Sequence, residues 1–299
     1  MKPHTVRRTV VIPFLCAVIV GCGHSRAPVI PLLNRPAAHD LREGVAVDEA
    51  RRLYREGLYD QARAAAEALT NAGSRHPELL YLQAEMAAQR GDHLAAATWC
   101  EQAIAASPLW PEPRIQLAQS WLKLERFAAA ESVFGDIERI VPTSPWGPYG
   151  IGAVAAMRGD AARATTYADQ ALSRDPNHQP SLSLAAHLAR QSGAAAREEE
   201  LLMRLTTLNP GDAATWARIG ELSLAGNRTT EGERSLERAY ALEARPVWAK
   251  TLADLATRRG DPVAAARWRS AAGTREPLRS GEGEPSEPSD NSLTADPPR

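Results

Sequence analysis

The chain has 299 residues, of which 44% are hydrophobic, 24% are charged and only 5% are aromatic, and its formal net charge is −1. A charge this close to zero argues against a nucleic-acid-binding protein, which usually carries a strong positive excess. An alanine-rich sequence with few aromatic side chains favours closely packed helices over a β-sandwich or barrel. We therefore expect an all-α fold, with enough chain to bury a sizeable core.

The beginning of the chain has the features of an export signal. A positively charged segment precedes an apolar stretch over residues 10–20, which is too short for a membrane-spanning helix of roughly 20 residues. The stretch leads into Ile19-Val20-Gly21-Cys22, which resembles the lipobox of bacterial lipoproteins. The resemblance implies a signal peptide over residues 1–21 and lipid attached to Cys22, which becomes the mature N-terminus. The alternative is an ordinary secretory signal with an incidental cysteine.

The same resemblance implies a location. The lipid would hold the protein at the cell membrane or outer membrane, facing the periplasm or the exterior. Gly23 follows the lipidated cysteine, and the absence of aspartate there favours the outer membrane. With Cys16 removed and Cys22 lipidated, Cys100 is the one thiol left, so we expect no internal disulfide.

One sequence pattern recurs along residues 43–273. A Gly-Asp pair is followed at a fixed distance by alanine, as in Gly91-Asp92 before Ala96 and Gly159-Asp160 before Ala164. This pattern resembles the tetratricopeptide repeat, a helix–turn–helix unit of 34 residues, here written helix A and helix B. We number the positions within a repeat as slots 1 to 34 and place the glycine at slot 15. Five of the six intervals between unit starts are then 34 residues and the sixth is 33. The units start at Glu43, Pro77, Pro111, Pro145, Gln179, Ala213 and Pro246. The resemblance implies a right-handed α-solenoid of about seven repeats.

The family pattern also assigns packing roles to slots of each repeat. Slots 8 and 20 need small residues where helix A meets helix B, and slot 24 packs against the next repeat. The glycine at slot 15 ends helix A in a left-handed conformation. Departures are Glu125 and Asn227 at slot 15 and Glu198 at slot 20. The first repeat has either three extra residues before Pro77 or a helix B that stops early at Gly73.

The segments on either side of the repeats differ in composition. Residues 22–42 contain several prolines and show no sustained helical period, so they form either an extended tether or a cap on the first repeat. Residues 274–299 contain five prolines, six acidic residues and three arginines, without an aromatic residue. This composition predicts a disordered acidic tail.

No pattern of catalytic residues is found in the sequence. The histidines of the repeat region lack a second metal ligand at helical spacing, and no phosphate-binding loop or nucleophile motif occurs. The acidic run Arg197-Glu198-Glu199-Glu200 is interpreted as the solvated start of a helix. Cys100 occupies slot 24 and is expected to be a small buried hydrophobe. We expect neither an enzyme nor a bound cofactor or metal.

Binding residues are therefore sought in the concave groove that helices A line in this family. Slots 2, 5, 9, 12 and 13 commonly face the ligand there. Candidate residues for binding a partner are Arg51, Tyr54, Tyr81, Gln119, Lys123, Trp146, Tyr149 and His187. Aromatic side chains in such slots suit an extended peptide or a partner helix. The alternative for Trp146 and Tyr149 is that they only cover the glycine-rich stretch 147–152.

These expectations favour a lipid-anchored scaffold of the cell envelope that binds a protein partner in its groove. Resemblance to lipoproteins of envelope assembly suggests a role in assembly or secretion machinery, although a fold does not fix a function. One alternative is a glycan-binding accessory of polysaccharide processing or export, with the aromatic side chains stacked on sugar. Another is a cytosolic or secreted scaffold, if the lipobox is false.

Overall fold

A computed structural model describes residues 41–273 of the chain. The predicted signal peptide, the lipidation of Cys22, nearly all of the tether or cap, and the acidic tail lie outside the described residues. Within the described range none of the helices combines the length and apolarity needed to cross a membrane.

Every regular element of this part of the chain is an α-helix, and the helices come in seven consecutive A and B pairs. The pairs are α2 (Leu41–Arg55) with α3 (Tyr59–Asn71), α4 (Pro77–Gln89) with α5 (His93–Ala106), α6 (Glu112–Lys123) with α7 (Phe127–Ile140), α8 (Trp146–Met157) with α9 (Ala161–Arg174), α10 (Gln179–Gln191) with α11 (Ala195–Leu208), α12 (Ala213–Ala225) with α13 (Thr229–Leu242), and α14 (Pro246–Arg259) with α15 (Pro262–Gly273). The prediction of an all-α helical repeat fold is confirmed.

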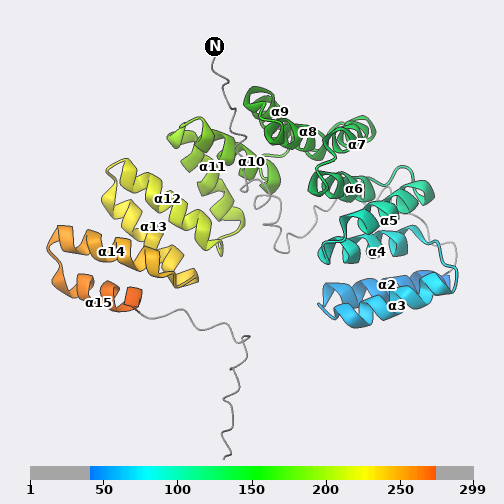
Figure 1. Ribbon diagram of the computed structural model, residues 1–299, viewed down its shortest axis with the longest axis horizontal. Helices are drawn as coiled ribbons and strands as arrows, with labels where there is room; N and C mark the ends of the chain where they lie inside the picture. The colour runs from blue at the N-terminus through cyan, green and yellow to red at the C-terminus, as the bar shows by residue number, and fades with distance from the viewer. Residues whose placement is uncertain (1–40, 274–299) are drawn as a thin grey trace, which may run out of the picture. The chain divides into compact units, whose positions relative to one another are not determined.

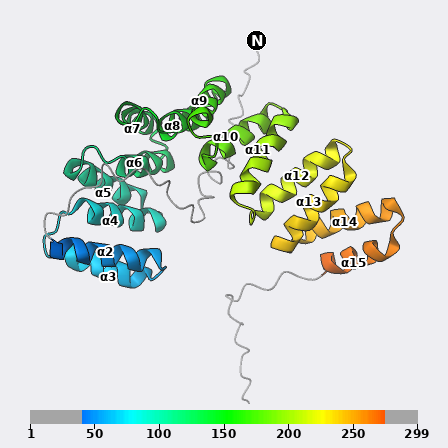
Figure 2. The same cartoon turned by 180° about the vertical axis from the view of Figure 1, so that it is seen from behind.

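The helices divide into two compact units. Unit 1 ends at Gly211 and its described part contains α2 to α11, whereas unit 2 begins at Asp212 and contains α12 to α15. In each unit helix A packs against helix B of the same repeat, and helix B packs against helix A of the next. Figures 1 and 2 show this succession of hairpins from opposite sides.

Small residues bring the two helices of a repeat close together, as slots 8 and 20 predict. Ala50 and Ala62 of the first repeat are completely buried, and so are Ala84 and Ala96 of the second. In the fourth repeat, a Cβ atom on Gly152 would lie 3.2 Å from the carbonyl oxygen of Ala164. A larger side chain at these slots would force the helix pair apart.

The residue at slot 24 connects one repeat to the next. Phe134 of α7 is completely buried, and its ring would lie only 2.1 Å from a Cβ atom on Gly150 of α8. The glycine therefore provides the space that the ring fills. The predicted contact between slot 24 and the following repeat is present here.

The turn after helix A keeps the same backbone where glycine is missing. Glu125 and Asn227 have φ angles of 57° and 59°, in the left-handed region that Gly91 occupies with a φ of 79°. In the first repeat, α3 ends at Asn71 and Gly73 takes a φ of 89°, which confirms the early stop. The position in the repeat therefore sets the left-handed backbone conformation at slot 15, even where a residue other than glycine is strained by it.

Unit 2 has its own apolar core. Leu236, Trp248 and Leu252 are buried in it, and the rings of Tyr240 and Trp268 meet edge to face at 5.2 Å. Gly220 and Gly232 lie opposite each other, since a Cβ atom on either would come within 3.1 Å of the other's carbonyl oxygen. Two glycines thus replace the usual alanine contact between α12 and α13.

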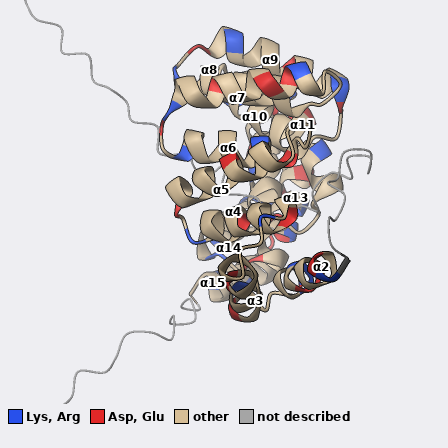
Figure 3. Ribbon diagram, turned by 90° about the vertical axis from the view of Figure 1, so that its right-hand side faces the viewer, with Lys and Arg blue, Asp and Glu red and all other residues tan. Residues whose placement is uncertain are grey.

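Charged residues of both signs are interspersed on the helices of unit 1 (Figure 3). Glu131 of α7 accepts hydrogen bonds from Arg158 at 2.5 Å and from Arg163 at 2.6 Å, which belong to the next repeat. Arg174 of α9 forms a two-pronged ion pair with Glu138 of α7. These pairs cross the boundary between the third and fourth repeats, where they add to the apolar contacts.

Candidate functional site

The A helices of unit 1, namely α2, α4, α6, α8 and α10, form a continuous surface that we call the A face. Each of these helices contacts the next one in the series, α2 with α4, α4 with α6, and so on to α10. Side chains at the slots predicted to meet a ligand therefore project from helices that lie side by side. The slots predicted to bind a ligand therefore share the A face, and ligand binding there stays a prediction.

At the α2–α4 end of the A face, several predicted residues come together. Arg51 donates a hydrogen bond to Glu78 over 2.5 Å, and the two side chains are 21% and 11% exposed. Tyr54 is partly buried and meets Tyr59 edge to face, with ring centroids 5.5 Å apart. The Glu78 carboxylate holds Arg51 in place, a partner that the sequence did not indicate.

Glu85 of α4 is partly buried and interacts electrostatically with Arg51, Arg55 and Tyr54. Burial raises the pKa of the Glu85 carboxyl to about 7, against the opposing effect of Arg51 and Arg55. Burial, with the charge of Glu85 added, likewise raises the pKa of Tyr54 to about 12 and that of Tyr81 well above 10. Glu85 stands at slot 9 of its repeat, so its place on the A face follows from the sequence, whereas its altered acidity does not.

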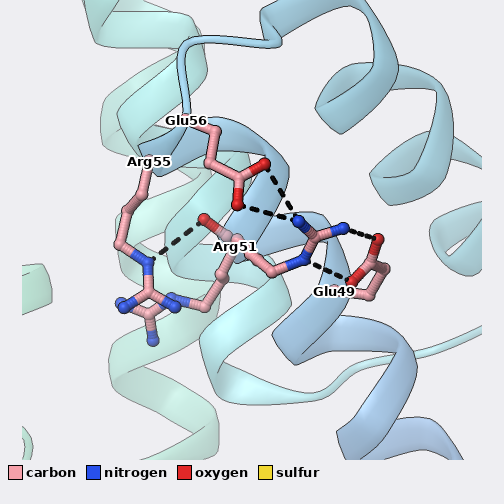
Figure 4. Close-up of polar contacts among 5 residues, drawn as sticks. Glu49, Arg51, Arg55 and Glu56 are labelled. Carbon is pink, nitrogen blue, oxygen red and sulfur yellow. Dashed lines mark hydrogen bonds and ion pairs between the residues drawn. The ribbon is translucent and has the colours of Figure 1, made fainter.

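The arginines of α2 have different surroundings (Figure 4). Arg52 is held on the exposed side by Glu49 and Glu56. Arg55 extends with Arg51 on the other side of the helix, and its one hydrogen bond within residues 41–273 is a long one of 3.4 Å to the carbonyl oxygen of Arg51. Of the three, Arg55 is the guanidinium most available to a ligand.

The aromatic residues of α8 are buried, which corrects the premise that they are free anchors. Trp146 and Tyr149 are only 9% and 5% exposed. Their rings meet each other at 5.6 Å and meet the ring of His178 at 4.6 and 5.4 Å. This burial removes the observation that favoured a stacked sugar, and a role of the two side chains in partner binding stays a prediction.

His178 belongs to this cluster and was not among the predicted site residues. It precedes α10 and is buried, and its Nδ1 lies 2.7 Å from the hydroxyl oxygen of Ser181. Burial lowers the pKa of His178 to about 4, so the ring is neutral near pH 7. Trp110 holds the same slot 34 two repeats earlier and meets Tyr81 in the same way, at 5.0 Å. The shared slot is the sequence signal that would have identified both contacts.

The remaining predicted residues lie further along the A face. Gln119 and Lys123 are partly buried on α6. Burial, with the charge of Lys123 added, lowers the pKa of His93. His187 is partly buried on α10, and burial lowers its pKa. The eight candidates therefore share one face but do not form one compact site.

Glu198 corrects the interpretation of the acidic run as solvated. Its side chain lies at slot 20 between α10 and α11 and is only 3% exposed, whereas the neighbouring Arg197 and Glu200 are exposed. The charge of Glu198 partly opposes the lowering of the His187 pKa. A helix start explains the run only for the residues that point outward.

In the described part of the chain, neither a cleft nor a group of metal ligands coincides with the eight candidate residues. A shallow cleft of about 570 Å³ lies between α9 and α11, crossed by the ion pair of Arg197 and Asp169, and none of the eight candidates lines it. Within residues 41–273, no group of three or more His, Cys, Asp or Glu side chains could hold a metal ion.

A family profile matches part of the chain. Residues 47–109, which run from within α2 to just beyond α5, match the sequence profile of the tetratricopeptide repeat. This part of the chain carries the tetratricopeptide repeat pattern. Proteins built from these repeats are in general non-enzymatic scaffolds for protein–protein interaction. No curated protein sequence matches the chain.

Solved tetratricopeptide structures have the same fold. A thermophilic repeat protein of Thermus thermophilus is 23% identical, with a TM-score of 0.51, over 61% of this chain and 99% of its own. A repeat protein of Parabacteroides merdae is 15% identical, with a TM-score of 0.56, over 79% of this chain and 86% of its own. The type IV pilus biogenesis factor PilW is 16% identical, with a TM-score of 0.57, over 68% of this chain and 94% of its own. Likeness at these identities shows the fold alone.

Proposed function

We propose that the protein is a scaffold of the cell envelope that binds a peptide or helix of a protein partner on its A face. The observation that carries the proposal is the line of contacting A helices, which presents partly exposed polar and aromatic side chains at the ligand slots. A continuous helical surface of this kind suits an extended peptide or an amphipathic helix. The binding residues that we propose include Arg51, Tyr54 and Tyr81.

The proposed client is an assembly or secretion machine of the envelope. PilW, which shares the fold, is a type IV pilus biogenesis factor. The lipobox-like sequence that ends at Cys22 supports lipid attachment to Cys22, and so anchoring at the cell membrane or outer membrane. Two or three acyl chains hold a protein at a membrane far better than one.

Co-purification from cells tests the partner surface. Arg55 and Gln89 are exposed at slot 13 of α2 and α4, so replacing both with alanine removes A-face contacts at little cost to the fold. We expect the tagged double variant to lose the proteins that co-purify with the wild type. The matched control replaces Arg139 and Gln170, which are exposed on α7 and α9. This control variant should keep the co-purifying proteins. Equal loss from both variants would contradict the proposal.

Mass spectrometry of the mature N-terminus tests the anchor. We expect a lipid-modified Cys22 at the first position, and a Cys22→Ala variant that leaves the membrane fraction. An unmodified Cys22 in a chain that still begins with Met1 would overturn the anchoring proposal, while the A-face proposal would stand.

A further inference from the structure

Glu85 differs from Glu78 on the A face because, among the described residues, only the longer-range charges of Arg51 and Arg55 act on it. Its carboxylate makes no hydrogen bond or ion pair with any residue between 41 and 273. Glu78, two turns earlier on the same face of α4, is by contrast bonded to Arg51. Glu85 is partly exposed, so a ligand on the A face can reach it.

The charged groups around Glu85 leave room for an added cation. From α2, Arg51 is already neutralised by Glu78, and Arg55 is exposed to solvent, which weakens its influence. Tyr81 on α4 and Cys100 on α5 are uncharged near pH 7, because burial raises the pKa of both. From α6, the charge of Glu112 reaches Tyr81 and adds negative potential at this end of the face.

We propose that this cluster binds a Lys or Arg side chain of the protein partner, with the cation paired to Glu85 and beside the rings of Tyr54 and Tyr81. The proposal rests on the proposed function and specifies the chemistry of the partner. A charge-assisted hydrogen bond to a partly buried carboxylate is among the stronger polar contacts. Phenol rings add attraction for a cation placed over their faces.

Such a site binds its ligand in a pH-dependent way. The carboxyl of Glu85 has a pKa of about 7, raised by burial, so it is mostly protonated at pH 6 and mostly ionised at pH 8. A cation pairs with the ionised form only, and binding therefore strengthens as the pH rises through 7. An acidic ligand held by Arg55 would show the opposite dependence, because ionised Glu85 repels it.

Peptide binding to the full-length chain tests the proposal. Three short labelled peptides alternate serine with lysine, glutamate or glutamine, and their affinities are measured by fluorescence anisotropy at pH 6 and pH 8. We expect the lysine peptide to bind more tightly than the other two. Its affinity should rise about tenfold from pH 6 to pH 8, as the ionised fraction of Glu85 does.

Two variants make the result specific. Glu85→Gln should remove the pH dependence and the preference for lysine. Glu67→Gln, which changes an exposed carboxylate on α3, should keep both. Tighter binding of the glutamate peptide, the absence of any charge preference, or a pH dependence that persists in Glu85→Gln would overturn the proposal. The co-purification experiment would still decide separately whether a partner occupies the A face.

Discussion

The ring of His178 is a buried titratable group between the fourth and fifth repeats. Burial lowers its pKa to about 4 from an ordinary value of 6.5. The unfolded chain therefore binds a proton at a higher pH than the folded chain does. The stability that the neutral ring contributes is present above pH 6.5 and is lost as the pH falls toward 4.

We expect a measurable acid sensitivity from this residue. Between pH 6.5 and pH 5 the free energy of unfolding of unit 1 should fall by about 1.5 kcal/mol through His178 alone. In His178→Gln this part of the pH dependence should disappear. Denaturant titrations followed by tryptophan fluorescence measure both slopes, since Trp146 lies against the ring. Identical slopes in the two proteins would contradict the assignment.

Glu125 affects stability through the backbone conformation of a single turn. It is exposed and has a positive φ, a conformation in which a side chain costs about 1 kcal/mol relative to glycine. We predict that Glu125→Gly raises the free energy of unfolding by about 1 kcal/mol, measured by chemical denaturation.

Gly91 provides the reciprocal test of the same turn. No atom would lie within 4 Å of a Cβ at this position, so Gly91→Ala changes only the backbone preference. It should lower the free energy of unfolding by about 1 kcal/mol. If both substitutions changed stability in the same direction, the left-handed turn would not be the cause.

At the scale of the helix, contact between repeats depends on where a glycine lies. Gly150 of α8 faces the ring of Phe134, so Gly150→Ala should destabilise unit 1 by about 3 kcal/mol through overpacking. Thermal unfolding followed by circular dichroism measures the loss.

Gly135 of α7 is the matched control for this prediction. It also lies within a helix, but a Cβ atom there would meet nothing within 4 Å. Gly135→Ala should therefore stabilise the protein by about 0.5 kcal/mol, since alanine is the better helix former. A similar loss in both variants would indicate helix propensity rather than the Phe134 contact.

The helices were predictable from the sequence because the small residues that permit close packing recur in a fixed register. Ala50, Ala84 and Ala118 at slot 8 are all completely buried, as that register requires. The burial of Trp146 and Tyr149 was missed because His178, which covers them, stands at slot 34, to which the repeat pattern assigned no packing role. The pattern placed Glu198 at slot 20, where helix A meets helix B, but its charge and the acidic residues beside it led to its interpretation as solvated.

At the scale of the molecule, the chain consists of two compact units with separate cores. Repeat proteins derive stability from neighbouring repeats, so a defect in one unit is felt mainly within it. Leu236→Ala in the unit 2 core should cost unit 2 about 3 kcal/mol. Hydrogen exchange should then accelerate in α12 to α15 and remain unchanged in α4 to α9. Equal acceleration in both regions would show that the units unfold together.

The central claim is that a protein partner binds on the A face of unit 1. Site-specific photocrosslinking in cells tests this claim most directly. A photoreactive residue is placed at Gln89 or Gln119, on A helices α4 and α6, or at Glu67 or Gln170, on B helices α3 and α9. We predict that the same partner protein is crosslinked from both A-face positions and from neither B-helix position. Crosslinks that form only from Glu67 and Gln170 would contradict it.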